Sequence, residues 1–249
     1  MTPRETSGGT QALRERHSAG PAAGRVDPGS APAAAAPIAP KPWLRGSIHA
    51  ATAPIALAVG IVLTVRAPTT QAAVAAGIFA ASAVVLFTVS ALYHLGAWSP
   101  RPRVILRRID HANILFLIAG TYTPFAVLAL PGGTRLAILG VVWGGAALGA
   151  VFRVVWTNAP RWVYVPLYLG PGWAAVFVLP QLLRGAGLPA LVLVAAGGVL
   201  YTLGGVAYGL KRPDPWPRWF GFHEIFHACT VAAFACQYIA VSLVVYHAD

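Results

Sequence analysis

The sequence predicts an all-α integral membrane protein with seven transmembrane helices, a cytoplasmic N-terminus and a C-terminus outside the cell. The first observation is composition: 57% of the 249 residues are hydrophobic and only 10% are charged, whereas about a quarter of the residues in soluble domains are charged. The second is the number of long apolar stretches, and the third is the uneven distribution of basic residues between them. Together these observations place the chain in a lipid bilayer.

Seven stretches have the length and low charge that a transmembrane helix needs, which is about 20 mostly apolar residues. The connectors between them are short and contain Pro, Gly, Arg or Thr, which favour turns. No alternation typical of β-strands competes with the helical interpretation. The predicted helices are 48–65, 73–95, 109–130, 135–152, 163–183, 189–210 and 221–247.

Residues 1–42 differ from the rest of the chain, because they are rich in Ala, Pro, Gly and Arg and have few large apolar side chains. Such a segment cannot bury enough apolar surface to offset the entropy of folding. We therefore expect a disordered cytoplasmic tail, followed by a seven-helix transmembrane domain at 43–249. The tail also lacks the apolar core of a cleaved signal peptide, so the first helix is expected to direct insertion.

The net charge of +11 is explained by membrane topology. Nucleic-acid binding would instead gather basic side chains on one face with interleaved aromatic residues, and no such partner is expected. Fifteen of the 18 Lys and Arg residues lie before the first helix or in the second, fourth and sixth connectors. The alternate side holds Arg66, Arg135 and Arg184. Because Lys and Arg stay on the cytoplasmic side, this bias predicts an odd number of spans, in a multi-pass protein of the plasma membrane.

Ionisable side chains are costly inside a bilayer and usually face a partner or a cavity. In this chain they gather at the end of the second predicted helix and at the starts of the third and seventh. The predicted topology places all three regions at one depth, near the cytoplasmic surface. The side chains concerned are Ser90, His94, Asp110, His223 and His227.

The spacing of the histidines indicates a metal site. His223 and His227 are four residues apart and share one helix face, so with His94 three imidazoles can converge from two helices. Three nitrogens with an open fourth position is the arrangement of catalytic zinc, and we predict Zn²⁺ here with Asp110 beside that position. A lone membrane histidine is more often a packed or interfacial residue. Three histidines are interpreted in that way: His17, His49 and His247.

Three polar residues near this group have open roles. Ser90 is as compatible with a bond from its hydroxyl to a carbonyl of its own helix as with a role in the site. His111 points some 100° away from Asp110 and is interpreted as a supporting or helix-contact residue. Glu224 completes an H-E-x-x-H pattern, in which zinc metalloproteases use the glutamate as the base. Asp110 and Glu224 are therefore alternative catalytic carboxylates.

These motifs resemble those of the hemolysin III family, the bacterial branch of the progestin and adipoQ receptor group. The resemblance rests on Ser90-x-x-x-His94, the block "DHANILFLIAGTYTP" from residue 110, and His223-x-x-x-His227, and it extends over nearly all of residues 43–247. It implies a seven-helix fold with a cytoplasmic N-terminus and a zinc held by the three histidines. Asp110 would hold the zinc-bound water, with Ser90 as the accompanying polar residue.

The wider superfamily includes alkaline ceramidases, which hydrolyse a lipid amide. We therefore expect a zinc-dependent hydrolase of a lipid amide or ester, with membrane lipids as partners and a lipid-like substrate. One alternative is a channel or cytolysin with a structural zinc, although a pore would need polar positions through the full membrane depth. A receptor and an intramembrane metalloprotease are further alternatives.

Overall fold

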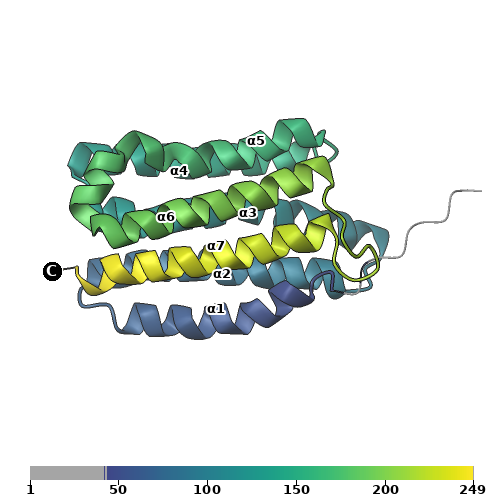
Figure 1. The fold of residues 1–249 in the computed structure, drawn as a ribbon, viewed down its shortest axis with the longest axis horizontal. Coiled ribbons are helices and arrows are strands. Elements are labelled where there is room, and N and C mark those ends of the chain that lie inside the picture. Colours follow the sequence, from purple (N-terminus) through teal and green to yellow (C-terminus); the bar gives the residue numbers. More distant parts are fainter. Residues whose placement is uncertain (1–41, 43, 249) are drawn as a thin grey trace, which may run out of the picture. The chain divides into compact units, whose positions relative to one another are not determined.

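The computed structural model describes residue 42 and residues 44–248, and this part of the chain is helical apart from its connectors and one isolated β-bridge between Trp216 and Phe220 (Figure 1). The tail predicted at 1–42 therefore lies outside the described residues except for Pro42, as does His17. The helices are α1 Ser47–Val65, α2 Thr70–Leu95, α3 Pro100–Ala129, α4 Gly132–Val155, α5 Arg161–Gly172, the 3₁₀ helix η1 Trp173–Val178, α6 Leu179–Leu210 and α7 Phe222–Tyr246.

The starts of α2 and α3 follow local sequence signals. The Thr69 hydroxyl accepts a hydrogen bond from the Ala72 backbone N–H at 3.2 Å and caps α2, as threonine commonly does at this position. Helix α3 starts at Pro100, nine residues before the predicted helix at 109–130. Proline is pre-organised for a first helical turn, so the helix continues through an arginine-rich segment that hydropathy alone interpreted as a connector.

The described residues contain six helices that are long and apolar enough to cross a membrane, and the protein is an all-α membrane protein. Five of them are single helices, and the fifth in chain order is the continuous 50-residue stretch Arg161–Leu210. Side chains on the outside of the bundle are apolar and exposed, for example Leu148 at 75% and Phe177 at 86%. Such a surface suits contact with lipid, since soluble proteins rarely expose large apolar patches.

The stretch Arg161–Leu210 folds back on itself. Gly187 has φ 79° and ψ 167°, a conformation that glycine adopts readily and other residues do not. The Arg161 guanidinium donates to the Tyr208 carbonyl at 2.7 Å, although the two residues are 47 apart. A straight helix of this length would extend about 75 Å, so the two arms must run antiparallel, as Figure 1 shows for α5 and α6. They coincide with the separately predicted helices 163–183 and 189–210.

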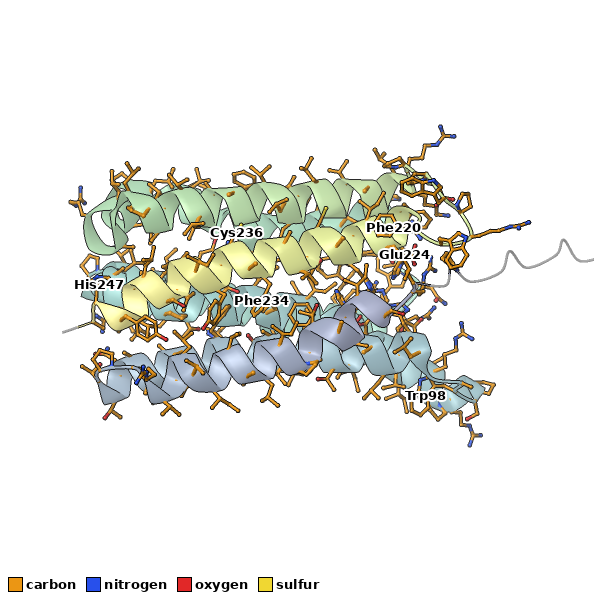
Figure 2. All side chains as sticks on the ribbon, turned by 60° about the horizontal axis from the view of Figure 1, so that its bottom comes forward. Trp98, Phe220, Glu224, Phe234, Cys236 and His247 are labelled. Atoms are coloured by element: carbon orange, nitrogen blue, oxygen red, sulfur yellow. The ribbon has the colours of Figure 1, made fainter. Side chains whose placement is uncertain are left out.

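Helix α7 packs against α1, α2, α3 and α6, most extensively against α6 (Figure 1). Close approach depends on small residues, as is common between membrane helices. A Cβ atom on Gly204 of α6 would lie only 2.9 Å from the Cβ of Cys229 on α7. Figure 2 shows side-chain nitrogens, in blue, gathered mainly at the end of the bundle that contains Glu224 and Trp98. This end is called the histidine end below, and the other the opposite end.

Candidate metal centre

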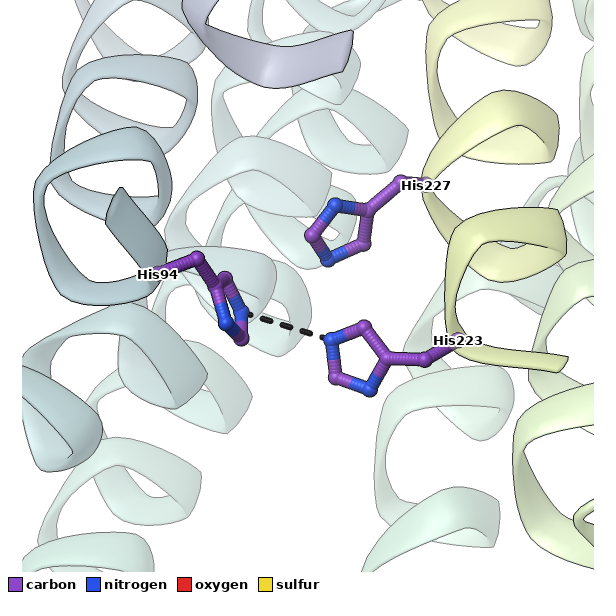
Figure 3. A group of neighbouring side chains, drawn as sticks. All are labelled: His94, His223 and His227. Atoms are coloured by element: carbon purple, nitrogen blue, oxygen red, sulfur yellow. Dashed lines mark hydrogen bonds between the residues drawn. The ribbon is translucent and has the colours of Figure 1, made fainter. Parts of the chain in front are cut away.

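Three histidines from two helices meet at the histidine end (Figure 3). His94 lies in the last turn of α2, and His223 and His227 lie in the first two turns of α7. The four-residue spacing on α7 puts its two rings on one helix face, and Figure 3 shows both directed toward His94. His94 and His227 are buried and His223 is half-buried. The convergence predicted from the sequence is present.

The geometry of the three rings fits a metal ion. One nitrogen from each ring lies within 4.8 Å of the others, and the Nε2 atoms of His94 and His223 are 3.3 Å apart. Two nitrogens bound to zinc at about 2.0–2.1 Å in tetrahedral geometry are about 3.3–3.4 Å apart. Neutral imidazole is also a preferred ligand for zinc and related transition metals. The group could therefore bind a metal ion with small movements of its rings.

A carboxylate and a hydroxyl lie directly beside the histidines. Asp110 Oδ2 on α3 is 3.9 Å from His94 Nε2, the same nitrogen that faces His223. The buried Ser90 hydroxyl, one turn before His94 on α2, hydrogen-bonds the Asp110 carboxylate. Asp110 and Ser90 also line one cavity together with His223 and His227. The structure thus brings all five predicted side chains together.

The Glu224 side chain is not part of the histidine group and pairs with Arg45 and with the start of α7. Its Oε1 atom accepts from Arg45 Nε at 2.6 Å, and its Oε2 atom accepts from the Gly221 backbone N–H at 2.9 Å. The side chain is 1% exposed and acts as the first-turn carboxylate of α7, which favours a helix start. His111 lines the same cavity as Asp110, but its Nδ1 donates to the Arg107 carbonyl at 2.5 Å and its ring contacts the Tyr164 ring. It is thereby a helix-contact residue.

The chain leading into α1 completes the surroundings of the histidines, and sequence reasoning missed this. The His49 ring stacks on His227 with a centroid distance of 3.9 Å and an angle of 5°. Gly46, at φ 90°, lies so close to α2 that a Cβ atom there would be 2.7 Å from the Cβ of His94. With Arg45 bonded to Glu224, the 45–49 segment contacts both sides of the group. His49 is packed, as predicted, but its packing partner belongs to the site.

A mainly apolar cavity of about 130 Å³ starts at this group and runs along the bundle. On α3 its lining begins at Asp110 and reaches Leu130, a distance of about 30 Å at the helical rise of 1.5 Å per residue. Side chains of α5, α6 and α7 close its other walls. Its length and apolar lining suit an extended hydrocarbon chain whose polar end lies at the histidines.

Comparison with known proteins identifies the family. Residues 38–238 match the model of the family described as haemolysin-III related. This chain belongs to the haemolysin-III related family. The resemblance inferred from the three motifs is therefore confirmed. The matched residues include the 45–49 segment and all five candidate side chains, so the whole centre lies within the shared region.

Two bacterial relatives and one animal relative illustrate the match. A hemolysin-3 homolog from Bacillus subtilis (strain 168) is 32% identical over 167 residues, which cover 66% of this chain and 74% of the relative. Hemolysin-3 from Bacillus cereus is 26% identical over 164 residues, covering 66% and 72%. Progestin and adipoQ receptor-like protein 1 from Caenorhabditis elegans is 25% identical over 183 residues, covering 66% of this chain and 42% of the relative.

Proposed function

We propose that this haemolysin-III related protein is a zinc-dependent hydrolase that cleaves a lipid amide or ester at the cytoplasmic face of the plasma membrane. The observation that carries the proposal is the position of the three-histidine group and Asp110 at one end of a long apolar cavity. A ligand in this cavity would place its chain in the membrane and its polar group at the histidines. Such a substrate comes from membrane lipids.

The topology that goes with this function has seven crossings. Each arm of the folded-back stretch Arg161–Leu210 would cross once, because the arms 161–186 and 188–210 extend about 39 Å and 35 Å as helices, enough for a hydrocarbon core of about 30 Å. The asymmetry of Lys and Arg supports, as part of this proposal, a cytoplasmic N-terminus and histidine end and a C-terminus outside.

In this proposal His94, His223 and His227 would hold the zinc, which would supply Lewis-acid chemistry for a carbonyl group and a water molecule. Asp110 acts as the general base that takes a proton from the attacking water. The carbon–nitrogen or carbon–oxygen bond of the substrate breaks, the water oxygen joins the carbonyl carbon, and Asp110 returns the proton to the leaving amine or alcohol. Ser90 orients the carboxylate by donating a hydrogen bond to it.

The first test is Asp110→Asn. A carboxamide keeps hydrogen-bonding capacity but cannot serve as a base, so hydrolysis of a fluorescent ceramide or acyl-ester analogue should fall about 10²–10⁴-fold while bound metal is retained. Elemental analysis of the same preparation checks the metal. A hydrolysis rate equal to that of the wild type would show that Asp110 is not the general base.

A second candidate function is membrane permeabilisation, and it is favoured by the name of one relative, hemolysin-3. The third relative is named as receptor-like, which favours a signalling role in the same way. In both cases the metal would be structural. Lipid hydrolysis absent from the wild-type protein, together with a retained metal, would favour these alternatives over the hydrolase.

A further inference from the structure

Two polar side chains lie in the middle of the apolar cavity, far from the histidines. They are Gln237 on α7 and Tyr201 on α6, and both contribute to the cavity lining. Gln237 is ten residues beyond His227, which is about 15 Å along the helix. Polar groups at this depth of a membrane protein are costly and usually serve a function.

The Gln237 amide has a fixed orientation and one unused oxygen. Its Nε2 atom donates to the Val194 carbonyl at 3.2 Å, which defines which end of the amide is the donor. Gly197 makes room for it, since a Cβ atom there would lie 2.5 Å from Nε2. The side chain is 5% exposed. Within the described part of the chain, Oε1 has no hydrogen-bond partner.

Tyr201 supplies the complementary group. Its hydroxyl also has no hydrogen-bond partner among the described residues, although a buried phenol normally finds one. Helices α6 and α7 run antiparallel, with Gly197 against Gln237 and Gly204 against Cys229. Because Tyr201 lies between these two glycines, it faces the part of α7 between Cys229 and Gln237, and it lines the same cavity as Gln237. A donor and an acceptor are thus offered within about one helical turn of each other along the cavity.

The threonine hydroxyls of the cavity do not share this property, whereas the Tyr168 hydroxyl, nearer to Asp110, does. Thr121, Thr202 and Thr230 each donate to the carbonyl four residues earlier in their own helix. An unpaired buried polar group is destabilising, so a hydrogen-bond partner for Gln237 Oε1 and the Tyr201 phenol would be strongly favoured. A single hydroxyl group on a bound ligand would satisfy both side chains, because it can donate a hydrogen bond to Gln237 Oε1 and accept one from the Tyr201 phenol O–H.

We propose that Tyr201 and Gln237 form a subsite for a hydroxyl group in the middle of the substrate's acyl chain. The inference rests on the proposed function and deepens it by naming the substrate class: a lipid amide or ester whose acyl chain is hydroxylated roughly a dozen carbon–carbon bonds from the carbonyl. Bonds of about 1.5 Å advance an extended zigzag chain by about 1.25 Å each, so about twelve of them cover the distance of about 15 Å. The chain of such a substrate lies in the apolar cavity, and the hydroxyl sets its depth.

The test compares the binding of fatty acids, which needs no turnover. The full chain, in lipid nanodiscs, is titrated with octadecanoate, 12-hydroxyoctadecanoate and 3-hydroxyoctadecanoate while thermal stability and native mass spectra are recorded. The 12-hydroxy acid should bind about tenfold more tightly than octadecanoate, as expected for two net hydrogen bonds. The 3-hydroxy acid, with its hydroxyl at another depth, should show no such preference.

Variants assign the preference to the two side chains. Gln237→Leu and Tyr201→Phe should each remove most of the preference while octadecanoate still binds, which also shows that the variants fold. Tyr238→Phe is the matched control, because the Tyr238 hydroxyl donates to the Val59 carbonyl, and it should keep the preference.

The possible failures are distinguishable. Equal affinity of the wild-type protein for octadecanoate and the 12-hydroxy acid, or a preference that survives both substitutions, would overturn the subsite and leave the proposed hydrolase in place. Binding of none of the three acids would overturn both, because the cavity would not then be an acyl-chain site.

Discussion

The two ends of the helix bundle are held together in different ways. At the histidine end, buried ionisable groups form specific pairs, such as Arg45 with Glu224 and His49 with His227. At the opposite end, α3, α6 and α7 meet through apolar or small residues, among them Leu130, Leu182 and Gly185. Tight packing alone stabilises a membrane bundle, so the additional cost of buried polar groups at one end indicates where function lies.

The comparison is tested most strongly by one substitution made at both ends. Gly46→Ala puts a methyl group against His94 and forces alanine into φ 90°, which costs about 1–2 kcal/mol for the backbone alone. Gly185→Ala puts a methyl group against the Ala129 carbonyl and should cost about 1–3 kcal/mol. Both should lower thermal stability, but only Gly46→Ala should lower bound metal. Equal metal in the two variants would remove the distinction between the ends.

Glu224→Gln separates the structural carboxylate from the catalytic one. The substitution removes the charge that Arg45 faces, and because Arg45 is 22% exposed the loss in free energy of unfolding should be about 1–3 kcal/mol. Metal content and hydrolysis per folded molecule should stay near wild type. Loss of hydrolysis with metal retained would instead identify Glu224 as the base and restore the metalloprotease-like interpretation.

Substitutions of His49 test whether its packing against the proposed metal ligand His227 contributes to metal affinity. Removing the ring with His49→Ala should weaken metal binding about tenfold, as loss of a supporting partner typically does, and competition with a chelator would measure this. His49→Phe keeps a ring that can stack on His227 and should restore most of the affinity. Failure of phenylalanine to restore it would mean that the imidazole nitrogens, rather than stacking, are required.

The smallest effect is expected on the lipid-facing surface. Leu148→Ala changes a side chain that is 75% exposed, so thermal stability should change by less than about 0.5 kcal/mol and metal content should not change. A large loss would show that this surface is buried in an assembly.

The helices and the histidine triple were accessible from sequence because both depend on short-range patterns. Apolar length marks a span, and four-residue spacing marks a shared face for His223 and His227. The start of α3 was placed too late because hydropathy identifies the membrane-embedded part of a helix rather than its first turn. The role of Glu224 was left open, since its partner Arg45 is 179 residues away in the chain.

Contacts between distant segments account for the rest of what was missed. The local sequence around Gly46 and His49 does not indicate that they approach His94 and His227. The Tyr201 hydroxyl and Gln237 Oε1 can be recognised as lacking hydrogen-bond partners in the described part of the chain only once the packing of α6 against α7 is known. One general signal was available for His49 and Gln237: polar side chains within apolar stretches are rarely placed there without a reason.

The proposed three-histidine zinc site is tested most directly by elemental analysis of the purified protein, for the wild type and for the double substitution His223→Ala/His227→Ala. His247→Ala serves as the control, because that histidine is exposed at the far end of α7 and bonds its own helix. We expect about one zinc per chain in the wild type and the control and almost none in the double variant, since one remaining imidazole cannot hold the ion. Equal metal in all three proteins, or none in the wild type, would contradict the proposed site.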